Sequence, residues 1–240
     1  PLLVAFKAVL WGCVFALFLR KTFSPSLGTA RTWPVMAVSV FLLFIFRFQF
    51  EIRPVVFSLL FLGVYWNVLP WLVCCWYDGV SVKRLLTVSV VLAILALQWI
   101  WCNVQGLYIL GPLFAGLCVA AAVAENFKKK GGRFSPARDV PAIFFVAVLF
   151  LTPFFHRDGL DLFLYPFGLL GRLLGISPSA VIFASEIAEN RSPVTLLMAG
   201  ENLLPSIMMI VVALIALAFA VERAVQGFWR ENLVTCGCLA

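Results

Sequence analysis

Charged residues are scarce in this sequence, and histidine is almost missing. Charged residues make up 12% of the 240 residues and hydrophobic residues 63%, and the single histidine is His156. A soluble domain typically has about 25% charged and about 45–50% apolar residues. With one histidine, the seven cysteines offer no zinc site of the usual Cys/His spacing, so we predict no metal. The composition excludes an ordinary soluble domain and indicates an integral membrane protein.

The common catalytic motifs are also missing from the chain. It has no glycine-rich phosphate loop, no His-Glu-x-x-His and no Gly-x-Ser-x-Gly, so nucleotide hydrolysis, zinc proteolysis and serine hydrolysis have no support. The net charge of +7 comes mostly from lysines and arginines beside hydrophobic runs, where membrane orientation explains them. Without a folded basic surface, we expect no nucleic-acid partner.

Hydrophobic runs long enough to cross a bilayer recur along the chain. A helix needs about 20 apolar residues to cross a hydrocarbon core of about 30 Å, and it satisfies its own backbone hydrogen bonds there. We therefore predict an all-α, polytopic transmembrane helical bundle, forming a single domain over residues 1–240 in contact with membrane lipids. The seven predicted spans are 1–19, 33–50, 54–76, 85–102, 107–124, 140–155 and 203–221.

Lysine and arginine gather on alternate connections between these spans. Twelve of the 18 fall after the first, third, fifth and seventh spans. Basic loops tend to stay in the cytoplasm, so we predict that these connections are cytoplasmic. The same count puts residue 1 on the outer face. We therefore expect a further span and outer loop upstream of the sequence in hand.

Three polar stretches fall on the predicted outer face: residues 50–58 (FEIRPVVFS), residues 102–106 (CNVQG) and residues 156–193. The first half of the third stretch is apolar, but Pro166 and several glycines interrupt it. We predict an interfacial or re-entrant helix there, rather than a span. Polar groups at membrane depth are costly and tend to mark a site or a buried pair.

Each polar stretch offers a candidate residue and an ordinary alternative. Arg53 precedes Pro54 at the expected start of a helix, where free backbone N–H groups and a guanidinium together suit an anion. Alternatively, Arg53 pairs with Glu51 or reaches lipid headgroups. Asn103 and Gln105 are able to bind sugar hydroxyls, or else they cap helices.

The third stretch opens on His156 and contains Glu189 and Arg191 near its end. His156 is a candidate general base, and the alternative is a solvated loop residue.

Four stretches, taken in order, resemble bacterial multi-spanning proteins with the GT-C glycosyltransferase-like architecture. They are FEIRPVVFSLLFL, LALQWIWCNVQGLYILGPLFAGL, FLTPFF and SEIAENRSP, within about residues 40–195. Those proteins carry an R-P-x-x-F-S stretch, a W-x-N-x-H-G-like turn before a glycine-rich span, and a later (N/T)-P-(F/Y) followed by an E-x-x-S-P-like stretch. Gln105 stands where that pattern has histidine.

The resemblance implies sugar transfer from a polyprenyl-phosphate donor on the outer face of the cytoplasmic membrane, with no other cofactor. It implies that Arg53 holds the carrier phosphate, that Asn103 lines the site, and that Glu189 and Arg191 lie at its rim. Enzymes of this architecture generally carry an acidic residue in their first outer loop, an element that this sequence does not contain. Whether the chain is an enzyme therefore stays open. The alternatives are a non-catalytic membrane subunit that binds partner proteins and, third, a transporter.

Overall fold

The computed structural model describes residues 2–22, 54–77, 84–129, 133–173, 193–200, 203–204, 206–211 and 214. Every regular element in these residues is a helix, and none of them forms a strand. The elements are α1 (Leu2–Thr22), α3 (Pro54–Tyr77), α4 (Arg84–Val104), η3 (Gly106–Ile109), α5 (Leu110–Lys129), α6 (Pro136–Leu151), η4 (Thr152–Phe155), α7 (Gly159–Leu173) and α9 (Pro193–Met198).

Five segments in the described part are long and apolar enough to cross a membrane: Leu2–Leu19, Val55–Tyr77, Leu85–Val104, Gly106–Phe127 and Pro136–Phe155. They match five of the seven predicted spans to within a few residues, so the described part of the chain confirms the predicted all-helical fold, with several helices long and apolar enough to cross a membrane. The predicted span 33–50 lies outside the described residues. Most of the predicted span 203–221 also lies outside them, and its described residues are helical. The predicted number of seven spans is therefore not confirmed.

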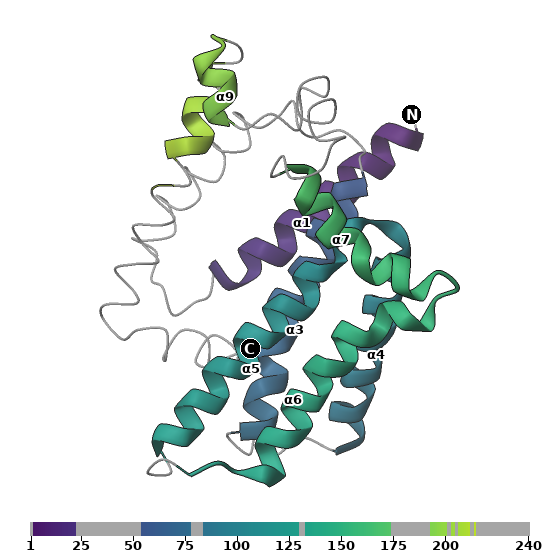
Figure 1. The fold of residues 1–240 in the computed structure, drawn as a ribbon, viewed down its shortest axis with the longest axis vertical. Helices are drawn as coiled ribbons and strands as arrows, with labels where there is room; N and C mark the ends of the chain where they lie inside the picture. The colour runs from purple at the N-terminus through teal and green to yellow at the C-terminus, as the bar shows by residue number, and fades with distance from the viewer. Residues whose placement is uncertain are drawn as a thin grey trace.

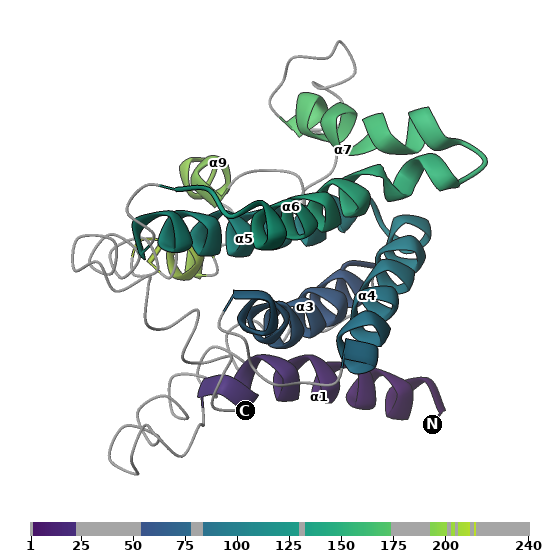
Figure 2. The same ribbon diagram turned by 90° about the horizontal axis from the view of Figure 1, so that it is seen from below.

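The long helices form successive layers (Figures 1 and 2). α1 packs across α3, which also contacts α4 and α5, and α5 in turn contacts α6. The bundle has two ends, which are named here by the elements and residues that lie at them. The "η3–η4 end" is where α4 leads into η3 and α6 leads into η4, and the "Asp139 end" is the opposite one, where α6 begins. Helices α3, α4, α5 and α6 run in alternating directions (Figure 1), and the connections from α4 to α5 and from α5 to α6 are short.

The Asp139 end is held by side-chain contacts to helix termini. Asp139, 1% exposed, lies in the first turn of α6, where a carboxylate is favoured by the helix dipole. Its carboxylate accepts hydrogen bonds from the Ser135 backbone N–H at 2.6 Å and from Asn126 Nδ2 on α5 at 3.2 Å. Arg138 Nη1 donates to the Tyr77 carbonyl at the end of α3, at 2.6 Å. These bonds join the ends of α3, α5 and α6.

A buried carboxamide, Gln98 of α4, lies in the core towards the η3–η4 end. It has 0% exposed surface. Tyr65 Oη on α3 donates to Gln98 Oε1 at 2.8 Å, and Gln98 Nε2 donates to the Tyr108 carbonyl in η3 at 3.1 Å. An unpaired amide away from water costs several kcal/mol, so these bonds fix α4 against both α3 and η3.

Close approach of α5 to this carboxamide requires a glycine. A Cβ atom on Gly111 would lie 2.6 Å from Gln98 Oε1 and 3.0 Å from the Trp101 ring. Both neighbours are fully buried and have little room to move. Gly111 is therefore required for the packing of α5 on α4.

We predict that Gly111→Ala lowers the free energy of unfolding by about 2 kcal/mol, because an added methyl group overpacks a filled core. Gly12→Ala is the matched control. A Cβ at Gly12, inside α1, meets nothing within 4 Å, and alanine is the better helix former. The measurement is the thermal unfolding midpoint in detergent, followed by circular dichroism. Equal midpoints for the two variants would contradict the packing described here.

Candidate functional site

An exposed aromatic stack lies at the η3–η4 end. The ring of Trp99, in the last turns of α4, stacks on the ring of His156, which follows η4, with centroids 4.9 Å apart and an interplanar angle of 15°. Trp99 keeps 47% of its surface exposed, and His156 is half-buried. The stack thus presents aromatic surface outside the packed core.

Asn103 completes this group. Its Nδ2 donates to the Trp99 carbonyl at 3.0 Å and lies 3.4 Å from His156 Nε2, a distance at which the amide N–H donates to an unprotonated ring nitrogen. Asn103 is exposed, so its carboxamide is accessible from outside. We call Trp99, Asn103 and His156 the "Trp99 cluster". It brings together two residues that the sequence singled out, Asn103 and His156.

Local structure explains this arrangement. Positions 99 and 103 are one turn apart and therefore share a face of α4. η4 begins with Thr152, whose Oγ1 donates to the Val148 carbonyl at 3.0 Å, and it ends where the His156 backbone N–H donates to the Pro153 carbonyl at 3.1 Å. This tight turn after α6 directs His156 toward α4.

A second set of hydrogen bonds supports the cluster from inside the bundle. Trp101 Nε1 donates to Ser58 Oγ on α3 at 2.8 Å, and Ser58 Oγ donates to Gln105 Oε1 at 2.8 Å. Gln105 Oε1 also accepts from the Leu107 backbone N–H at 2.8 Å, which caps η3. Gln105 therefore caps η3, as one of the two interpretations of this residue expects, and its proposed contact with a sugar stays a prediction.

Helix α7 packs beside η3 and η4 (Figure 2). Tyr108 Oη donates to the Leu162 carbonyl at 2.5 Å. A Cβ on Gly106 would overlap the Tyr165 ring, so glycine lets this ring lie against the backbone of η3. α7 has 15 residues, which is too short to cross the membrane, and Leu160, Leu164 and Phe167 are exposed on it. These features are typical of the interfacial helix that the sequence predicts.

The other predicted site residues, Glu51, Arg53, Glu189 and Arg191, lie outside the described residues. Helix α3 does begin at Pro54, directly after Arg53 in the sequence. Its first turns lie at the η3–η4 end, since Ser58 bonds with Trp101 and Gln105 there.

The described ranges contain no group of three His, Cys, Asp or Glu side chains able to hold a metal ion.

Sequence reasoning did not single out Trp99 as a site residue and missed its contact with His156. A weak signal was available, because Trp99 and Asn103 stand at the spacing that places two side chains on one helix face. His156, which follows η4, is 53 positions away from Asn103 in the sequence. Its contact with α4 becomes apparent only in the folded chain.

Comparison with known proteins finds no matching family model, no matching curated protein and no matching solved structure.

We predict that Ser58→Ala lowers the free energy of unfolding by about 2 kcal/mol, because it leaves the buried Trp101 Nε1–H without an acceptor. Ser89→Ala is the matched control, since Ser89 is exposed and bonds only within its own helix, to the Leu85 carbonyl. Chemical denaturation in mixed micelles measures both variants. If Ser58→Ala lowers the free energy of unfolding no more than Ser89→Ala does, the supporting hydrogen bonds are not important for stability.

Proposed function

We propose that this chain is a membrane glycosyltransferase-like protein that receives the headgroup of a polyprenyl-phosphate-linked sugar at the η3–η4 end. The observation that carries the proposal is the Trp99 cluster, an exposed indole with an amide and an imidazole nitrogen beside it. Binding sites commonly combine an apolar or aromatic surface with a few convergent polar groups, as here.

Each group suits one part of such a headgroup. The indole face of Trp99 offers a flat surface for a sugar ring, and the Asn103 carboxamide suits sugar hydroxyls. The backbone N–H groups in the first turn of α3, which have no partner within the helix, together with Arg53, favour the carrier phosphate. His156 is the candidate proton acceptor for an incoming hydroxyl. Glu189 and Arg191 keep their proposed place at the rim of the site.

The proposed orientation puts the Asp139 end in the cytoplasm of a bacterium and the η3–η4 end outside its inner membrane. Support comes from the basic residues Lys128, Lys129, Arg133 and Arg138, which all stand at the Asp139 end. Basic residues are enriched on the cytoplasmic side of spans.

A second function is favoured by a different observation. Helix α7 exposes apolar side chains beside the Trp99 cluster, including Leu160 at 60% and Phe167 at 54%. Such a surface also suits a non-catalytic subunit that keeps the scaffold and binds a partner protein in the membrane. Lipid binding at the Trp99 cluster discriminates between the two functions.

The first experiment measures binding of undecaprenyl phosphate and undecaprenyl phosphate–glucose to the purified protein by native mass spectrometry. We predict that both lipids bind, and that Asn103→Ala and His156→Ala each weaken binding of the glucosylated lipid about tenfold, the equivalent of one lost hydrogen bond. Binding of undecaprenyl phosphate itself changes less, because the phosphate is held elsewhere. Ser89→Ala serves as the control.

Wild-type binding of the glucosylated lipid by both variants would reject the Trp99 cluster as the sugar site. Failure of the wild-type protein to bind either lipid would favour the non-catalytic subunit.

A separate experiment tests the orientation. Arg133 and Asp158 are exposed at opposite ends of the bundle, and each is replaced by cysteine. We predict that a membrane-impermeant maleimide labels Asp158→Cys in intact spheroplasts, above the background of the parent chain, and labels Arg133→Cys only after permeabilisation. The reverse pattern would overturn the proposed orientation.

A further inference from the structure

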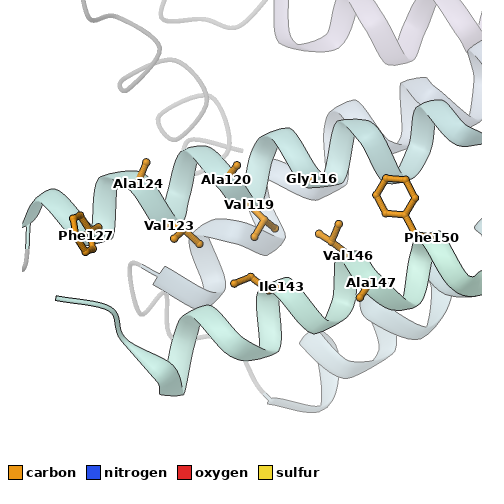
Figure 3. A pocket seen from close by; sticks show the side chains of 10 residues that line it. All are labelled: Gly116, Val119, Ala120, Val123, Ala124, Phe127, Ile143, Val146, Ala147 and Phe150. Carbon is orange, nitrogen blue, oxygen red and sulfur yellow. The ribbon is translucent and has the colours of Figure 1, made fainter. Parts of the chain in front are cut away.

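A groove runs along α5 and α6 (Figure 3), and none of the residues that line it belongs to the Trp99 cluster. Its volume is about 660 Å³, and all ten side chains or glycines that line it are apolar. The residues important here are Gly116, Ala120, Ala124 and Phe127 of α5, with Ala147 and Phe150 of α6.

Small residues create this groove. Gly116, Ala120 and Ala124 follow one another at intervals of four along one face of α5, and Ala147 lies opposite on α6. The three alanines are exposed, whereas Ala115 and Ala122 of α5 are buried against the rest of the bundle. The groove therefore opens toward the surroundings of the bundle, at the level of two membrane-length segments.

The length of the groove matches one leaflet of a bilayer. Gly116 and Phe127 are eleven positions apart, which at 1.5 Å per residue is about 16 Å. The whole hydrocarbon core is about 30 Å thick. A membrane-crossing helix from another protein would need a groove through both leaflets, whereas a lipid acyl chain occupies one.

The charge at one end of the groove indicates the headgroup. Phe127 lines the groove at the Asp139 end, and Lys128 and Lys129 follow it in the last turn of α5. Arg133 lies just beyond and is exposed. Basic residues at the boundary of a span attract anionic lipids by about 1 kcal/mol each.

We infer that the α5–α6 groove binds one acyl chain of an anionic phospholipid, with its phosphate at the Lys128–Lys129 end. The leaflet is the one on the basic side of the protein. This site is separate from the Trp99 cluster and does not depend on the proposed transferase function.

The test uses the full chain in vesicles of phosphatidylcholine that contain a minor fraction of phosphatidylglycerol with a diazirine in its acyl chain. After illumination, mass spectrometry locates the crosslinks. We expect them on the groove-lining stretches 116–127 and 143–150. A parallel sample with diazirine-labelled phosphatidylcholine should give about tenfold fewer.

Two sets of variants separate the acyl chain from the headgroup. Ala120→Leu with Ala124→Leu fills the groove and should reduce these crosslinks about tenfold, whereas Ala121→Leu, exposed on α5 but outside the groove, should leave them unchanged. Lys128→Gln with Lys129→Gln should weaken the preference for phosphatidylglycerol, since only Arg133 of these three basic residues then remains, while crosslinking to phosphatidylcholine persists.

Three results would overturn the inference. One is crosslinks spread evenly over the exposed faces of α5 and α6. Another is equal labelling by the two lipids in the wild-type protein. The third is an absence of lipid crosslinks at 116–127 and 143–150 in a protein that size-exclusion chromatography shows to be a dimer, which would make a second copy the occupant. Circular dichroism of each variant confirms that it is folded before the lipids are compared.

Discussion

The η3–η4 end depends on one constraint, which is that the buried carboxamide of Gln98 must have hydrogen-bond partners. It finds them in Tyr65 of α3 and in the backbone of η3 at Tyr108. These bonds hold the last turns of α4 in one position, and the Trp99 and Asn103 side chains project from those turns. Polar groups that are satisfied inside an apolar bundle therefore orient the exposed groups at its end.

The two ends of the bundle use their polar side chains differently. At the Asp139 end, a buried carboxylate and an arginine are bonded to helix termini, so they contribute to the joining of three helices. At the η3–η4 end, the inner side chains Ser58 and Gln105 are similarly occupied, while Asn103 and the Trp99 ring remain exposed. The exposed side chains, Trp99 and Asn103, are available to a ligand, whereas the side chains that are bonded within the bundle hold the helices in place.

Much of the helical structure could be predicted from the sequence, because apolar runs of membrane length have few other stable conformations. The start of α3 at Pro54 and the short amphipathic α7 also follow from local signals. The contact between Trp99 and His156 could not be predicted, because it depends on how α4 and η4 pack. The hydrogen bonds of the Gln105 side chain with Ser58 and with the N–H of Leu107 could not be predicted either, because they depend on how α3 packs against η3.

The most direct test of the account is an electron cryomicroscopy map of the full chain in lipid nanodiscs with undecaprenyl phosphate–glucose. The account predicts phosphate density at the start of α3, next to Arg53, with the sugar lying against Trp99 and within hydrogen-bonding distance of Asn103. Density for the headgroup elsewhere on the protein, with the Trp99 cluster unoccupied, would contradict it.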